Sequence, residues 1–202
     1  MGEDASLPLS MTEILSLPLP CALLLIDLQK AIDAPYWGPR NNPQAEENIA
    51  ALLAAWRNAG WPIIHVRHDS TDDHSAYRAG TDTAQFKPQA MPLPGETITP
   101  KQAHSAFVGT DLHQRLRQRG IAALCVGGVI TDNSVEATVR HGADLGWAIA
   151  LIEDACFTVD RRLRDGTIVP AAQMHARSLA LLEGEYAKIV ATAQALQWIG
   201  SL

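Results

Sequence analysis

The stretch CALLLIDLQ (21–29) is an almost unbroken apolar run that ends at Asp27. Such a run is typical of a β-strand that is buried on both faces, as in a parallel sheet. Working outward from it, the sequence holds further runs of the same kind. They are WPIIHVRHDS (61–70), ETITPK (96–101), IAALCVGGV (121–129), AIALIEDA (148–155) and AKIVAT (187–192).

Segments with helical spacing of apolar residues separate most of these predicted strands. They are PQAEENIAALLAAWRNAG (43–60), DLHQRLRQRG (111–120), TDNSVEATVRHGADLGW (131–147), AAQMHARSLALLEG (171–184) and a terminal helix at 193–199. Alternating strands and helices indicate right-handed βαβ crossovers and a parallel sheet covered on both faces. Residues 71–95 lack periodicity and are expected to form a long loop, which is usually functional or mobile.

Composition favours an ordinary globular enzyme or binding protein. The chain has 202 residues, which suits one domain at 20–202 preceded by an N-terminal extension at 1–19. A net charge of -6 gives no basic footprint for nucleic acid. No apolar run reaches the ~18–20 residues of a membrane span. The N-terminus lacks the basic start and apolar core of a signal peptide, so a cytoplasmic location is expected.

Cysteine and histidine give no pattern typical of a metal site. Cys21, Cys125 and Cys156 are widely spaced, without a C-x-x-C pair, and are expected to be buried as small hydrophobic residues. Asp72 and His74 form an isolated D-x-H, whereas a metal site would need more ligands within reach. We therefore expect a protein that needs neither a metal nor another cofactor.

Three polar residues are expected to meet at one edge of the sheet. Asp27 ends the first strand, Lys101 ends the third predicted strand, and Ser134 lies in the first turn of the helix after the fourth. Ligands of open α/β sheets bind outside the carboxyl ends of the strands. An Asp–Lys pair there would keep the carboxylate ionised. Taken alone, Asp27 could equally be a helix cap or a loop salt bridge, and a lone Lys101 would more often be a surface lysine.

Ser134 admits two interpretations. A nucleophile at the start of a helix gains backbone N–H donors that stabilise an oxyanion. Serine in the first turn of a helix is also a common capping residue, and Asp132 or Asn133 could cap equally well.

In four segments the chain resembles the isochorismatase-like, or cysteine hydrolase, superfamily over roughly residues 20–192. They are LLLIDLQ with Asp27, HVRHDS (65–70), KQAHSAFVGTDL (101–112) and GGVITDNSVEATVRHGADLGW (127–147). The resemblance implies a single-domain, doubly wound parallel sheet of six strands with helices on both faces. It also implies an Asp–Lys–Cys triad acting on amides, ureides and related C–N bonds.

Carried onto this sequence, the resemblance makes Asp27 the general base and acid, with Lys101 as its electrostatic support. It places the nucleophile at Ser134. It also implies a cis peptide between Val129 and Ile130, with the backbone N–H groups of Ile130 and Ser134 as oxyanion donors.

A serine stands where the family's cysteine is expected, and this departure leaves the chemistry open. An alcohol is far harder to deprotonate than a thiol. The chain could be a natural serine variant, or a protein in which cysteine was replaced by serine in the laboratory. It could also belong with the isochorismatase-type members, which lack the cysteine and hydrolyse a vinyl ether by protonation from the Asp. A non-catalytic binding protein that kept the fold is a further alternative.

The substrate is expected to be a small molecule. Candidate contacts are the aromatic residues Tyr36, Trp37, Phe107 and Phe157, together with His104, which replaces the Asn of many relatives. Arg67, His68 and Arg78 could attract a substrate carboxylate or simply be solvated. The metal-binding nicotinamidase branch carries an Asp-x-His directly after its second strand, and HDST (68–71) lacks that pair in register.

Members of this superfamily commonly form dimers or tetramers, so the resemblance also implies a homodimer or homotetramer. The terminal helix and the 71–95 loop are plausible contact regions.

Overall fold

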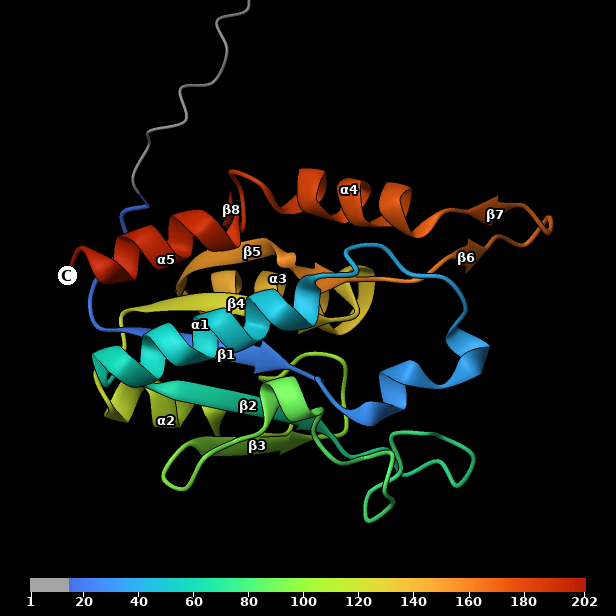
Figure 1. Ribbon diagram of the computed structural model, residues 1–202, viewed down its shortest axis with the longest axis horizontal. Helices are drawn as coiled ribbons and strands as arrows, with labels where there is room; N and C mark the ends of the chain where they lie inside the picture. The colour runs from blue at the N-terminus through green and yellow to red at the C-terminus, as the bar shows by residue number, and fades with distance from the viewer. Residues whose placement is uncertain (1–14) are drawn as a thin grey trace, which may run out of the picture.

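A six-stranded parallel sheet forms the centre of the molecule (Figure 1). The computed structural model describes residues 15–202, so most of the expected N-terminal extension at 1–19 lies outside the described residues. The strand order is β3-β2-β1-β4-β5-β8, which confirms the predicted doubly wound α/β sheet. The strands are β1 (Cys21–Ile26), β2 (Ile63–His68), β3 (Thr97–Lys101), β4 (Ala123–Val129), β5 (Ala148–Phe157) and β8 (Lys188–Val190).

Helices cover both faces of the sheet (Figure 1). One face carries α1 (Ala45–Ala59) and α5 (Thr192–Gly200), and the other carries α2 (Leu112–Gln118), α3 (Glu136–Asp144) and α4 (Ala171–Leu182). None of the helices in residues 15–202 is long and apolar enough to cross a membrane.

The apolar character of β1 follows from its place between two cores. Leu23 and Leu25 belong to the core beneath α1 and α5, whereas Leu24 and Ile26 belong to the core beneath α2 and α3. All four are at most 1% exposed, so both faces of this strand are removed from water.

The order of the strands determines where a ligand can bind. The chain runs outward from β1 through β2 to β3, then crosses to the other side of β1 and continues as β4. The connections therefore diverge between β1 and β4, and a crevice forms at the carboxyl ends of strands at such a switch point. Asp27 directly follows β1, and Ile130 directly follows β4.

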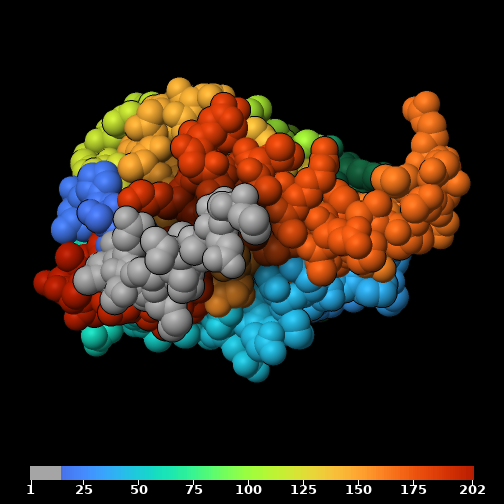
Figure 2. All heavy atoms as spheres, turned by 90° about the horizontal axis from the view of Figure 1, so that it is seen from above, coloured from blue at the N-terminus to red at the C-terminus, as the bar shows by residue number. Residues whose placement is uncertain are grey.

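Two segments differ from the sequence-based expectation. The predicted helix at 131–147 is interrupted: the backbone at Asp132 is not helical, and the turn Thr131–Val135 is kinked before α3 begins at Glu136. A two-stranded hairpin of β6 (Arg161–Arg162) and β7 (Ile168–Val169) was not predicted, because strands of two residues leave no periodic pattern. Figures 1 and 2 show this hairpin projecting from the body of the molecule.

Candidate active site

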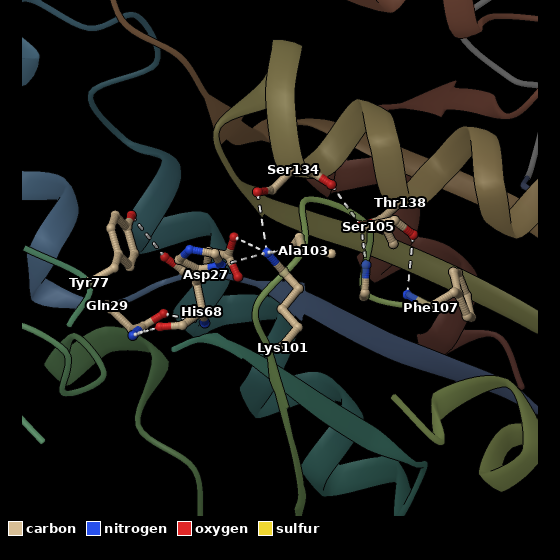
Figure 3. Close-up of polar contacts among 11 residues, drawn as sticks. Asp27, Gln29, His68, Tyr77, Lys101, Ala103, Ser105, Phe107, Ser134 and Thr138 are labelled. Carbon is tan, nitrogen blue, oxygen red and sulfur yellow. Dashed lines mark hydrogen bonds and ion pairs between the residues drawn. The ribbon is translucent and has the colours of Figure 1, made fainter. Parts of the chain in front are cut away.

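The structure brings Asp27, Lys101 and Ser134 together at the switch point (Figure 3). Lys101 Nζ lies 2.7 Å from Asp27 Oδ2 and 3.4 Å from Ser134 Oγ. The three residues come from the ends of β1 and β3 and from the turn after β4. The expected convergence of these side chains at one edge of the sheet is therefore observed.

Backbone geometry at the ends of β1 and β4 allows this approach. Asp27 has a φ of 54°, a left-handed conformation that Asp tolerates better than most residues. Gly128 pairs in register with Ile26 and has a φ of 128°. A Cβ at Gly128 would lie 2.2 Å from the carbonyl oxygen of Ile26, so only glycine lets the two strands come this close.

The ammonium group of Lys101 is the centre of the cluster. Besides Asp27 and Ser134, it contacts the carbonyl oxygen of Ala103 at 3.0 Å and Nδ1 of His68 at 3.4 Å. An ammonium has three N–H donors and no acceptor, so the four groups share its hydrogen bonds. Lys101 is only 2% exposed, which strengthens each of these contacts.

Only one of the two carboxylate oxygens of Asp27 accepts a hydrogen bond from the described part of the chain. Its Oδ2 accepts from Lys101, whereas its buried Oδ1 has no hydrogen-bond partner among residues 15–202. Burial raises the pKa of Asp27, and the charge and hydrogen bond of Lys101 and the hydroxyl of Ser134 oppose that rise. The result is a carboxylate with raised basicity and one oxygen available for proton transfer.

A cavity of about 380 Å³ opens onto this cluster. Asp27, Ser134 and Ile130 form part of its wall, together with Tyr36, Trp37 and His104, which the sequence had suggested as substrate contacts. The remaining lining residues are His68, Asp72, His74, Ser75, Tyr77, Val129 and Asn133. The volume suits a small molecule.

Two aromatic residues expected in the pocket do not line it. Phe107 is 8% exposed and packs in the core beneath α2 and α3, where its ring lies 5.7 Å from that of His141. Phe157 is the last residue of β5, is 1% exposed, and lies under the guanidinium of Arg40. The prediction that these two residues bind substrate is corrected, because their rings are used in packing.

Of the three cationic candidates, only His68 lines the cavity. Arg67 forms a two-bonded ion pair with Asp69, and Arg78 pairs with Asp73. Both guanidinium groups are therefore engaged in ion pairs, and neither residue lines the cavity.

The backbone after β4 presents a donor to the cavity. The peptide bond between Val129 and Ile130 is cis. The carbonyl oxygen of Ile130 accepts from the N–H groups of Asn133 and Val135. Within residues 15–202 the N–H of Ile130 has no acceptor, so it can donate to a bound molecule.

The cysteines are unsuited to replace Ser134 as nucleophile. Cys21, Cys125 and Cys156 are fully buried inside strands. A hydrogen bond from Cys21 and burial raise the pKa of Cys125, and burial raises that of Cys156 to about 12. Thiols in such surroundings are inert.

In the part of the chain that the structure describes, no group of three or more His, Cys, Asp or Glu side chains is arranged to hold a metal ion. Asp72 and His74 both line the cavity, but the contact between them is a turn, in which Asp72 Oδ1 accepts from the backbone N–H of His74 at 2.9 Å.

Two further residues support the cavity wall and were missed from the sequence. Gln29 is fully buried and bonds both the N–H and the carbonyl of His68, at 2.8 and 2.9 Å. Tyr77 directs its hydroxyl at the carbonyl oxygen of Asp27, 3.5 Å away (Figure 3). Burial and the charge of Asp27 raise the pKa of Tyr77 well above its ordinary value, so it remains a neutral phenol. Gln29 carried one signal, a polar residue at the end of a buried strand, whereas Tyr77 lies in an irregular loop.

Comparison with known proteins identifies relatives of similar length. The family model described as the isochorismatase domain matches residues 21–194. The isochorismatase family protein YrdC of Bacillus subtilis, which is uncharacterised, is 37% identical over 173 residues, covering 86% of this chain and 92% of YrdC. A crystal structure from Chromobacterium violaceum, described as that of a hydrolase of the isochorismatase family, is 51% identical. It superposes with a TM-score of 0.87 over 90% of this chain and 94% of that one.

A more distant relative has a named activity. The ureidoacrylate amidohydrolase RutB of Cronobacter sakazakii is 26% identical over 173 residues, covering 68% of this chain and 75% of RutB.

Proposed function

The chain belongs to the isochorismatase family of hydrolases, and we propose that it hydrolyses a C–N bond of a small amide or ureide through a covalent intermediate on Ser134. The observation that carries the proposal is the position of Lys101 Nζ, 2.7 Å from Asp27 Oδ2 and 3.4 Å from Ser134 Oγ. This arrangement joins a base, a cation and a hydroxyl at the wall of a cavity of about 380 Å³. The amidohydrolase activity named for RutB supports the substrate class.

In the first half of the reaction, Asp27 accepts the proton of the Ser134 hydroxyl while Oγ attacks the substrate carbonyl carbon. The negative charge that develops on the carbonyl oxygen is stabilised by the N–H of Ile130, together with that of Ser134. Asp27 then gives its proton to the leaving nitrogen, the C–N bond breaks, and an acyl-serine ester remains.

In the second half, Asp27 accepts a proton from a water molecule that attacks the ester carbonyl. Collapse of the resulting intermediate breaks the C–Oγ bond, and Asp27 returns the proton to Oγ of Ser134. The sum is one water consumed, with an acid and an amine or ammonia released.

Serine is the weak point of this chemistry, and the surroundings of Asp27 offset part of the difficulty. The raised pKa of Asp27 makes its carboxylate a stronger base toward an alcohol. Lys101 lies close enough to Oγ to stabilise an alkoxide that develops there. Both effects favour nucleophilic attack by Ser134.

Substitution at position 134 tests the covalent route. We expect Ser134→Ala to lose turnover across a panel of small amides and ureides. We expect Ser134→Cys to raise kcat/KM by about tenfold or more, because a few per cent of a thiol is ionised near neutral pH. Trapping of an acyl-enzyme by rapid acid quench, read by intact mass, would locate the covalent bond. A folded Ser134→Cys variant that stays inert on the whole panel would contradict the proposal.

A second function is favoured by one observation: Oδ1 of Asp27 has no hydrogen-bond partner among residues 15–202. A carboxyl group whose burial raises its pKa can hold a proton on that oxygen and act as a general acid toward a vinyl ether, without a covalent intermediate. With isochorismate as substrate, Ser134→Ala would then keep its activity while Asp27→Ala would lose it. If the unsubstituted protein and both variants turn over neither substrate class, the chain is a binding protein and both catalytic proposals fail.

A further inference from the structure

His68 lines the cavity beside the triad but has no part in the proposed proton transfers. It is the last residue of β2 and pairs in register with Lys101 of β3. Its Nδ1 lies 3.4 Å from Lys101 Nζ. Figure 3 draws the two side chains beside each other.

The contact with Lys101 determines which ring nitrogen carries the proton. The ammonium group can only donate hydrogen bonds, so Nδ1 of His68 must present its lone pair to it. The ring proton of a neutral His68 therefore resides on Nε2.

The surroundings keep the ring uncharged. Burial and the nearby charges of Lys101 and His104 lower the pKa of His68 to about 4, against an opposing effect of Asp69. The fourth neighbour, Tyr77, contributes an uncharged ring, which packs edge-on at 5.6 Å.

The backbone of His68 is also held in place. Gln29 bonds the backbone of His68 on both sides, and its amide nitrogen donates as well to the carbonyl of Ala84 at 2.9 Å. Because Gln29 is fully buried, water does not compete for these hydrogen bonds. His68 Nε2 itself has no acceptor anywhere in residues 15–202, although the residue borders the cavity.

We propose that His68 determines substrate specificity by donating one hydrogen bond, from Nε2–H, to an uncharged oxygen of the substrate, such as a keto, hydroxy or amide oxygen. This inference rests on the proposed function for its site and deepens it by naming a feature of the substrate. A donor with no charge gives little compensation for removing a carboxylate from water, whereas it matches a neutral acceptor.

Nuclear magnetic resonance of protein labelled with ¹⁵N-histidine tests the tautomer without any substrate. We expect His68 to remain the Nε2–H tautomer without titrating between pH 5 and 8. In Lys101→Met, we expect a midpoint displaced upward, because the nearby positive charge is gone. His68→Gln assigns the signals. A proton on Nδ1, or a midpoint near the ordinary value of about 6.5, would overturn the proposal.

Binding of matched amides tests the contact itself. The probes are butyramide, acetoacetamide, which adds a neutral keto oxygen, and succinamate, which adds a carboxylate. They are titrated into Ser134→Ala protein so that turnover plays no part. We expect acetoacetamide to bind about fivefold more tightly than butyramide, since a net neutral hydrogen bond contributes about 1 kcal/mol. Succinamate should gain no such advantage.

Further substitutions made in the Ser134→Ala background assign that preference to one nitrogen. His68→Leu should remove the preference for acetoacetamide, and His68→Gln, which keeps an N–H donor, should retain much of it. His113→Leu, outside the cavity on α2, is the matched control. A preference that survives His68→Leu, or the absence of any shift at Nε2 with all three amides, would exclude the contact. Because these readouts are binding and tautomer state, failure of the hydrolysis assay does not affect them.

Discussion

Two ion pairs lie at the two ends of β3, one buried and one partly buried, and their carboxylates differ in how many hydrogen bonds they accept. At the carboxyl end, Lys101 pairs with Asp27. Just before the amino end, Glu96 pairs with Arg57 and with His65. Both carboxylates are removed from most of the water around them, yet their pKa values shift in opposite directions.

The number of donors explains the difference. Arg57 donates to both oxygens of Glu96, at 2.7 and 3.0 Å, and Oε2 also receives His65 Nε2 at 2.7 Å and the N–H of Leu93 at 2.9 Å. Burial acts to raise the pKa of Glu96, but these donors lower it to about 2. Asp27 has one cation on one oxygen, and its other oxygen is free of partners within residues 15–202. A carboxylate whose two oxygens both accept hydrogen bonds stabilises the fold. A carboxylate with one oxygen free of hydrogen bonds can accept a proton.

The largest expected effect comes from removing the basic carboxylate. Asp27→Asn should lower kcat/KM by about 10²- to 10⁴-fold, the usual contribution of a general base. The matched control is Glu96→Gln, which makes the same chemical change at the other end of β3 and should leave kcat/KM intact. Steady-state kinetics on the best amide found for the unsubstituted protein measures both. Equal losses in the two variants would mean that both act through folding alone.

Removing the lysine should cost stability. Lys101→Met leaves Asp27 buried without its cation, and breaking such a pair costs about 3–5 kcal/mol. A lone buried carboxyl escapes this penalty by binding a proton, so the loss should be smaller at pH 5 than at pH 8. Urea unfolding at the two pH values measures the difference. A loss that is the same at both would show that Asp27 stays ionised in the folded variant and binds no extra proton.

Much of the fold and the centre of the site could be predicted from local patterns. The apolar run that ends at Asp27 showed a strand buried on both faces, and the position of Lys101 at a strand end placed it at the same edge. The helix start placed residues 131–134 at that edge, and the resemblance to the isochorismatase-like superfamily then singled out Ser134. For the strands and the helix start, the signal lies within a few residues of the side chain concerned.

The rest of the cavity depends on contacts between distant segments. Tyr77 lies in an irregular segment that is held by backbone hydrogen bonds. The N–H of Ser70 donates to the carbonyl of Tyr77, and the N–H of Lys87 donates to the carbonyl of Leu28. No local period encodes these bonds. Phe107 and Phe157 were predicted to contact the substrate but do not line the cavity. An aromatic residue beside a catalytic motif looks the same in sequence whether it faces the ligand or the core.

Glu96→Gln tests the second half of the comparison, that the carboxylate of Glu96 stabilises the fold. It keeps the shape of the side chain but removes the charge that Arg57 and His65 share, so a loss of about 1–3 kcal/mol is expected near neutral pH. The loss should depend on pH in a defined window. The folded pKa of about 2 lies below the unfolded value, so Glu96 stabilises the protein above pH ~4.5, and this contribution declines as the pH falls toward 2.

Chemical unfolding of Glu96→Gln and of the unsubstituted protein between pH 2.5 and 7 tests that window. The two curves of unfolding free energy should converge toward the acidic end. Curves that stay parallel throughout would mean that folding does not lower the pKa of Glu96, contrary to its four donors.

The smallest loss of unfolding free energy is expected for a substitution at His65, the uncharged member of the cluster around Glu96. Burial lowers the pKa of His65, so its Nε2–H donates to Glu96 as an uncharged ring. His65→Leu removes that bond, but it also removes the buried Nδ1, which has no partner in residues 15–202. The two changes oppose each other, so the net loss should be about 1 kcal/mol, less than for Glu96→Gln. Thermal unfolding measures it, and a loss as large as that of Glu96→Gln would mean that His65 is charged and that the cluster is a true three-membered ion network.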